Sequence, residues 1–206
     1  MSIYSRYTFL FLSSVLLLSY DRETVVLVND VSSIRYRGDR AELHLSAGVG
    51  EWKMEGPNGI SLIFSRGDGT IISYCPFGCE IWGSVSPEQH IQVVLQHGDI
   101  ELNDIPSADI FLSDGSIDGS GIGEVDMHIG RGRFDLSLCT GSQLSVQGYE
   151  IDGKLFLCSG IWNQSFVNGV MERQVTMQED AIGSYKIQIA AGTLDVLSDS
   201  VAEVSK

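Results

Sequence analysis

Acidic side chains recur in this chain at a fixed distance after a glycine. Glu101, Asp118, Asp135 and Asp195 each stand three residues after a glycine, and the first three are seventeen residues apart. On stacked strands they would form a row of like charges about 4.8 Å apart, which destabilises a sheet unless the repulsion is relieved. A divalent cation such as Ca²⁺, which takes carboxylate oxygens as ligands, or a basic partner surface would relieve it. The alternative is a solvated acidic face that keeps the protein soluble.

The four cysteines allow two disulfides. Cys139 and Cys158 lie in similar segments, SLCTG and FLCSG, so neighbouring turns of a stack would bring their sulfurs together and favour a Cys139–Cys158 disulfide. Cys75 and Cys79 enclose three residues, a spacing that suits either a small disulfide loop or two thiolate ligands of a metal. Unpaired buried cysteines are the alternative.

No recognisable catalytic motif is present. The chain has four histidines, His44, His90, His97 and His128. None belongs to a known sequence motif with a serine or cysteine nucleophile. Asp114 and Asp118 could supply the paired carboxylates of a polysaccharide hydrolase or lyase, although both stand where a turn favours Asp for backbone reasons. We therefore expect a protein that is not an enzyme and has no cofactor, with Ca²⁺ as the one candidate ion.

Composition supports a folded, acidic protein. The chain has 206 residues, 13 Lys and Arg against 27 Asp and Glu, a formal charge of −14, 43% hydrophobic residues and 19% charged residues. The apolar fraction is too high for a disordered chain. Phosphate binding needs clustered Lys and Arg, which are missing from the sequence, so nucleic acids are excluded as partners.

The N-terminus predicts export. Thr8 to Ser19 is an uncharged apolar run preceded by a single positive charge at Arg6. It is shorter than the ~20 residues of a spanning helix, so residues 1–20 are interpreted as a signal peptide or a short N-terminal anchor. The expected location is the periplasm, the cell surface or the extracellular space. A buried element of a cytosolic domain is the alternative.

The elements that would position these side chains follow a repeat of about seventeen residues. Gly98, Gly115 and Gly132 are seventeen residues apart, and Gly192 heads a fourth copy. Apolar residues stand five and three places before each glycine and two places after it: Val93, Leu95, Ile100, Ile110, Leu112, Ile117, Met127, Ile129, Phe134, Ile187, Ile189 and Leu194. This alternation is typical of short strands with one buried face, and glycine permits a corner between them. It predicts an all-β fold, a β-solenoid, with a β-sandwich as the alternative.

The repeat also suggests how the chain is organised. Residues 21–86 contain short strand-like runs between turns and form a less regular β region or cap, in which Gly50 heads a degenerate copy of the repeat. Residues 87–197 hold the regular repeats, and residues 198–206 form a polar tail. Trp52, Trp82 and Trp162 could stack on sugars, but buried aromatic side chains are the expectation.

The segments QHIQVVLQHGDIEL, ADIFLSDGSID and EVDMHIGRGRFDL resemble the bacterial putative-adhesin β-solenoid family. The resemblance covers roughly residues 85–196, and its main content is the glycine corners. It implies an envelope-associated domain with a surface or periplasmic role and supplies no catalytic residues. The sequence departs from the pattern between Gly141 and Gly183.

Together these features predict an exported, non-enzymatic β-solenoid that acts as an adhesin-like binding or structural protein. A β-helix carbohydrate-active hydrolase or lyase and an envelope sensing or regulatory protein are the alternatives. The expected partner is a surface protein or a polysaccharide. Unpaired strand edges at the ends of the stack would also allow self-association.

Overall fold

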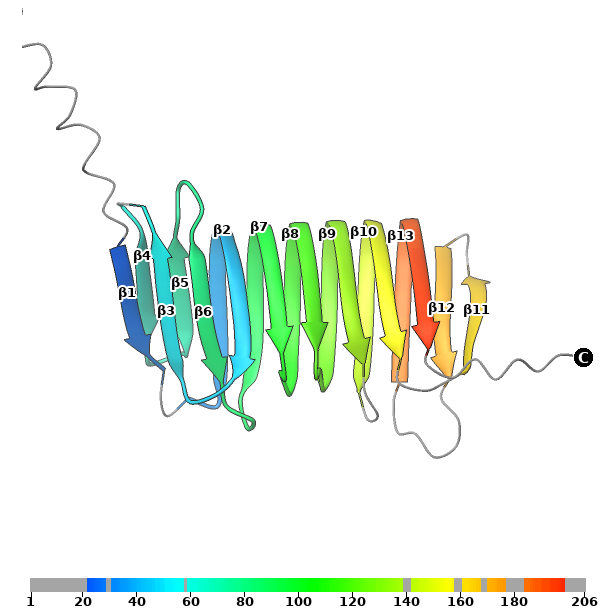
Figure 1. Ribbon diagram of the computed structural model, residues 1–206, viewed down its shortest axis with the longest axis horizontal. Helices are drawn as coiled ribbons and strands as arrows, with labels where there is room; N and C mark the ends of the chain where they lie inside the picture. Colours follow the sequence, from blue (N-terminus) through cyan, green and yellow to red (C-terminus); the bar gives the residue numbers. More distant parts are fainter. Residues whose placement is uncertain are drawn as a thin grey trace, which may run out of the picture.

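The computed structural model describes residues 22–28, 31–57, 59–138, 142–157, 161–167, 170–176 and 184–198. Within these ranges the fold is all-β, and thirteen strands form one sheet that is largely parallel (Figure 1). The described ranges include no helix of the length and apolarity that a membrane span requires.

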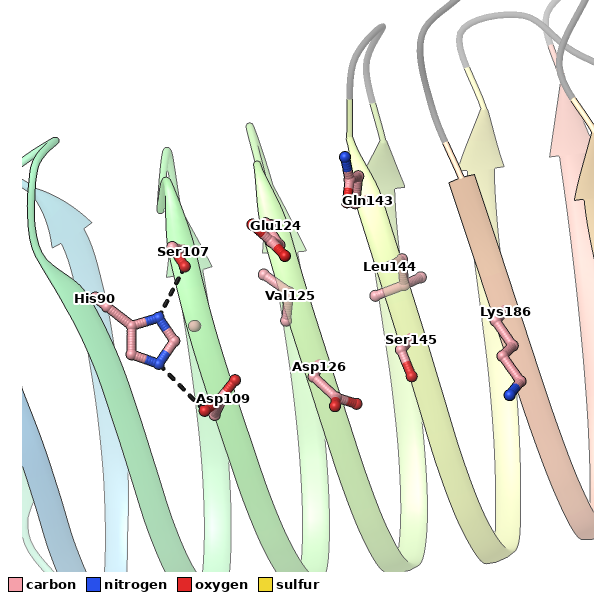
Figure 2. A pocket seen from close by; sticks show the side chains of 11 residues that line it. His90, Ser107, Asp109, Glu124, Val125, Asp126, Gln143, Leu144, Ser145 and Lys186 are labelled. Carbon is pink, nitrogen blue, oxygen red and sulfur yellow. Dashed lines mark hydrogen bonds and ion pairs between the residues drawn. The ribbon is translucent and has the colours of Figure 1, made fainter.

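Six long strands make up the middle of the molecule. In spatial order they are β2 (Ser33–Ala47), β7 (His90–Asn103), β8 (Ser107–Ser120), β9 (Glu124–Leu138), β10 (Gln143–Leu157) and β13 (Ser184–Ser198). Neighbours pair in parallel, whereas a sandwich made of hairpins would pair them antiparallel. Each long strand bends at its centre, so that its first half lies in one layer and its second half returns in a second layer (Figures 1 and 2).

Glycine occupies the bend in three consecutive strands. Gly98 lies opposite Gly115, and Gly115 lies opposite Gly132, as the seventeen-residue period predicts. All three have positive φ angles, of 142°, 148° and 143°. A Cβ atom on Gly115 would lie 1.7 Å from the carbonyl oxygen of Gly98. The positive φ angle and this close approach therefore require glycine at Gly115.

The core lies between the two layers. All twelve apolar positions of the predicted repeat are buried, which confirms the assignment of their inward faces: Val93, Leu95, Ile100, Ile110, Leu112, Ile117, Met127, Ile129, Phe134, Ile187, Ile189 and Leu194. The alternating burial along β7, β8 and β9 shows that outward residues stand between the buried ones.

Large side chains fill the space beside several inward-facing glycines. The ring of Trp52, which is buried as expected, covers Gly83, and the ring of Phe134 covers Gly153. Gly119 lies opposite Leu102 and Leu136, and Ile122 from the following loop covers it. Residues distant in sequence thus keep the interior filled, as close packing requires.

Two details of the predicted repeat are corrected. Gly50 is not a bend: Ala41 of β2 lies opposite Gly98, so the bend of β2 is at Ala41, nine residues before Gly50. The segment after Gly141, which broke the sequence pattern, contains the regular strand β10. Its bend is at Ile151, opposite Gly132 and nineteen residues later, and the buried Ile151 side chain occupies the space beside Gly148.

The N-terminal end of the stack is made of shorter strands. β5 (Thr70–Tyr74) and β6 (Glu80–Val85) pair in parallel with the first and second halves of β2. The loop between them replaces the bend and is closed by a Cys75–Cys79 disulfide, one of the two arrangements that the spacing allowed. β4 (Ser61–Ser65) pairs antiparallel with β5, β3 (Glu51–Gly56) with β6, and β1 (Arg22–Leu27) with β3.

An antiparallel hairpin adjoins β13 at the other end. β12 (Val170–Thr176) pairs with the first half of β13, and β11 (Ile161–Val167) pairs with β12. Cys139, Cys158, the expected signal or anchor at 1–20 and most of the expected tail at 198–206 lie outside the described residues.

Candidate binding face

A polar recess lies on the outer face of the first layer. The first halves of β7 to β10 and of β13 enclose about 470 Å³ (Figure 2). Five strands contribute the polar lining: His90, Ser107, Asp109, Glu124, Asp126, Gln143, Ser145 and Lys186. They point outward because residues at alternate positions, such as Ala108, Val125 and Leu144, point into the core.

His90 connects two residues of the neighbouring strand. Its Nδ1 atom lies 2.8 Å from Ser107 Oγ, and its Nε2 atom lies 3.2 Å from Asp109 Oδ2 (Figure 2). Ser107 and Asp109 are two residues apart on β8, so both project to the same face. Sequence motifs did not reveal this group, although Ser107 stands one seventeen-residue period after His90.

The group can hold and pass on a proton. With Nε2–H donating to the Asp109 carboxylate, Nδ1 is free to accept the Ser107 hydroxyl proton, the roles that a serine hydrolase assigns to its base and orienting carboxylate. Acyl transfer also needs N–H donors around the developing oxyanion. β8 pairs with β7 on one side and with β9 on the other. Its backbone N–H groups therefore donate hydrogen bonds within the sheet and are not available to an oxyanion.

A row with apolar and aromatic members runs beside the recess. Val94, Phe111 and His128 lie opposite one another on β7, β8 and β9. The rings of Phe111 and His128 are parallel, with centroids 4.9 Å apart. His128 Nε2 also lies 3.7 Å from Asp126 Oδ1, so an ion pair links this row to the recess.

The predicted acidic row lies on the second layer. Glu101, Asp118 and Asp135 are direct neighbours on β7, β8 and β9, as the period predicted. Asp195 is not the next member, because Lys154 of β10 lies between Asp135 and Asp195. At the other end His44 of β2 lies opposite Glu101.

Hydrogen bonds stabilise the charge of Glu101. Asn103 Nδ2 donates to Glu101 Oε1 at 2.9 Å, and His44 Nδ1 lies 2.7 Å from Glu101 Oε2. These contacts, Asn103 first, lower the pKa of the Glu101 carboxyl. The His44 ring also stacks on Trp82, with centroids 5.6 Å apart, and Lys53 Nζ lies 5.7 Å from the Trp82 ring centre.

Asp118, the central member of the acidic row, has a raised pKa. Burial raises the pKa of its carboxyl, Arg133 lowers it, and the charges of Asp135, Asp99 and Glu101 raise it further. Repulsion between the carboxylates of the row therefore acts on Asp118 at its centre. The basic residues His44 and Lys154 lie beside its two ends.

Neither a calcium site nor a carboxylate pair is established. In the described part of the chain, no group of three or more His, Cys, Asp or Glu side chains is arranged to hold a metal ion. Calcium binding by Glu101, Asp118, Asp135 and Asp195 stays a prediction. Asp114 precedes the Gly115 bend and lies opposite Arg131, whereas Asp118 follows the bend and belongs to the other layer.

The sequence matches no model of a known protein family and no curated protein. In structure the chain is similar to a putative cell adhesion protein from Clostridium sporogenes ATCC 15579, with a TM-score of 0.49, 10% sequence identity and coverage of 88% of this chain and 100% of that chain. It is also similar to a putative adhesin from Bacteroides fragilis NCTC 9343, with a TM-score of 0.40, 10% identity and coverage of 86% and 97%. We therefore base the function of this chain on its own residues.

Proposed function

We propose that the protein is an exported, adhesin-like binding protein of the cell envelope or surface, built on a β-solenoid of which β2, β7 to β10 and β13 are successive turns. The observation that carries the proposal is the recess. Five strands that are neighbours in the sheet present hydrogen-bonding side chains there, separated by the spacing between strands. Such a face suits a long partner with repeated polar groups, such as a polysaccharide lying across the strands. The Cys75–Cys79 disulfide supports export, because such bonds persist in oxidising compartments.

Binding to immobilised polysaccharides tests this function. Dextran, hyaluronan and peptidoglycan cover neutral, acidic and amino-sugar polymers. We expect the full chain to bind at least one of them, and the recess variant Asp126→Ala with Gln143→Ala to bind it about tenfold more weakly for each hydrogen bond lost.

The control places the same loss of polar groups on the other layer of β9. The variant Asp135→Ala with Ser137→Ala should bind as the unchanged chain does, because both residues follow the Gly132 bend. Equal weakening in both variants, or no binding to any polymer, would contradict a polysaccharide site in the recess.

A second candidate function follows from the His90 group. Ser107 activated by His90 and Asp109 would make the recess the site of an ester hydrolase. Covalent labelling of Ser107 by a fluorophosphonate, lost in His90→Gln, would support it. If Ser107 is not labelled, the hydrogen bonds of His90 have a structural role instead.

A further inference from the structure

Three apolar side chains are exposed together at the N-terminal end of the first layer. Ile63 of β4 lies opposite Ile72 of β5, and their exposed fractions are 58% and 48%. Tyr74, two residues further along β5, is 60% exposed. The alternation of β5 places Ile71 in the core, so Ile72 and Tyr74 share the outer face. An exposed apolar cluster of this kind marks an interaction surface.

Arginines border this cluster. Arg37 of β2 lies opposite Ile72, and Arg35 lies opposite Thr70 on the same outer face. Arg66 stands in the exposed turn that joins β4 to β5. The ion pairs found within the described ranges involve none of these three arginines. We call Ile63, Ile72, Tyr74, Arg35, Arg37 and Arg66 the β4–β5 patch.

The charge of the chain is divided unevenly along the stack. Residues 22–86, which contain β1 to β6, have six Lys and Arg and eight Asp and Glu, whereas residues 87–157 have three and twelve. An anionic surface would therefore attract the three arginines of the β4–β5 patch and repel the later strands, so that the stack would tilt with its N-terminal end nearest the surface. The apolar run Thr8–Ser19 ends three residues before β1, and β1 belongs to this same end of the stack (Figure 1).

We infer that the β4–β5 patch docks on an anionic lipid surface. Its apolar side chains enter the interface between headgroups and acyl chains, and its arginines bind lipid phosphates. The recess lies on the same outer face, so the stack must tilt when the patch docks, which lifts the recess carboxylates Asp109, Glu124 and Asp126 away from the membrane. The inference is independent of the ligand of the recess.

Photolabelling from the lipid phase tests this docking with the full chain. The chain is placed on vesicles of phosphatidylcholine with or without phosphatidylglycerol, each containing a diazirine phospholipid, and labelled peptides are identified by mass spectrometry. Because the label is assigned to a peptide, labelling of residues 61–74 is distinguished from attachment of the chain to the membrane through residues 1–20. We expect label in residues 61–74 on the anionic vesicles, and less at high salt.

The chain supplies a matched control for exposed apolar side chains. Phe156 and Leu197, which lie opposite each other on the second layer, are 40% and 50% exposed and should remain unlabelled. Arg35→Gln, Arg37→Gln and Arg66→Gln should reduce labelling of residues 61–74 by about fivefold for each arginine lost. Arg133→Gln, on the second layer, should change nothing.

Three results would overturn the inference. Equal labelling of the β4–β5 patch and of the Phe156 and Leu197 peptides would mean contact without a preferred face. Labelling that is the same without phosphatidylglycerol or without the three arginines would remove the role of charge. An unlabelled patch in a chain that sediments as a dimer, and as a monomer after Ile63→Asp, would assign the patch to a second copy. Thermal melting of each variant verifies that it is folded.

Discussion

Tyr36 and Ser73 form a polar pair inside the N-terminal part of the core. Their hydroxyl oxygens lie 2.7 Å apart, and burial raises the pKa of Tyr36 to about 12, an effect that the bond to Ser73 partly opposes. The neutral phenol is the form that the folded state prefers. Its contribution to stability is complete below the unfolded pKa of about 10 and is lost as the pH rises through 12.

Tyr36→Phe tests this pair. At neutral pH the variant should lose about 1–3 kcal/mol of unfolding free energy, because Ser73 is left without its buried partner. Between about pH 10 and 12 the unchanged chain should lose stability faster than the variant. Urea denaturation at a series of pH values measures both effects, and identical pH dependence in the two proteins would contradict the buried phenol.

Asp118 lies between two like charges on neighbouring strands. Burial and these charges raise the pKa of its carboxyl, against the opposing effect of Arg133, so ionised Asp118 lowers the stability of the folded state. Asp118→Asn should therefore raise the unfolding free energy by a few tenths of a kcal/mol, the size of one cross-strand charge pair. Ser120→Asn, on the same face of β8, is the control.

The unchanged chain and the Asp118→Asn variant also test the predicted binding of calcium by the acidic row. A rise in the melting temperature with Ca²⁺ that Asp118→Asn abolishes would support a cation on this row. An equal response of both proteins to Ca²⁺ would leave Asp118 as an acidic residue of the solvated face.

At the scale of the element, the bend of each long strand depends on what lies beside it. Gly115 cannot accept a Cβ atom, because the Gly98 carbonyl oxygen occupies that position. Gly115→Ala should cost about 3 kcal/mol or more of unfolding free energy, through the positive φ angle and the contact. Gly67→Ala is a matched control with no atom within 4 Å of its new Cβ, and an equal loss in both variants would contradict the stacked bends.

The bend between β5 and β6 depends on a covalent bond instead. Replacing Cys75 and Cys79 by Ala should cost about 2 kcal/mol, the loop entropy that a closure of this length removes from the unfolded chain. A reductant should lower the unfolding free energy of the parent chain and not that of the variant. Reductant sensitivity that persists in the variant would reveal the second predicted disulfide, Cys139–Cys158.

At the scale of the whole molecule, the formal charge of −14 opposes compaction. Like charges on stacked strands lie within a Debye length of one another at low salt, so raising NaCl from about 0.01 M to about 0.3 M should raise the melting temperature. A melting temperature that is constant or falls over this range would mean that the ion pairs formed by His44, Arg131 and Lys53 outweigh the repulsion.

The sequence by itself determined which residues face the core wherever the repeat is regular, because a two-residue alternation beside a corner glycine has one way to bury its apolar face. It also determined the neighbours within the acidic row from Glu101 to Asp135, since the period sets the register. It missed β10, whose bend is Ile151, and so missed Lys154 in that row. The tertiary structure alone decided which side chains make contacts between strands. Trp52 packs on Gly83, Ile122 packs on Gly119, and His90 lies between Ser107 and Asp109. Such contacts depend on volume and on side-chain direction after stacking, and a linear pattern contains neither.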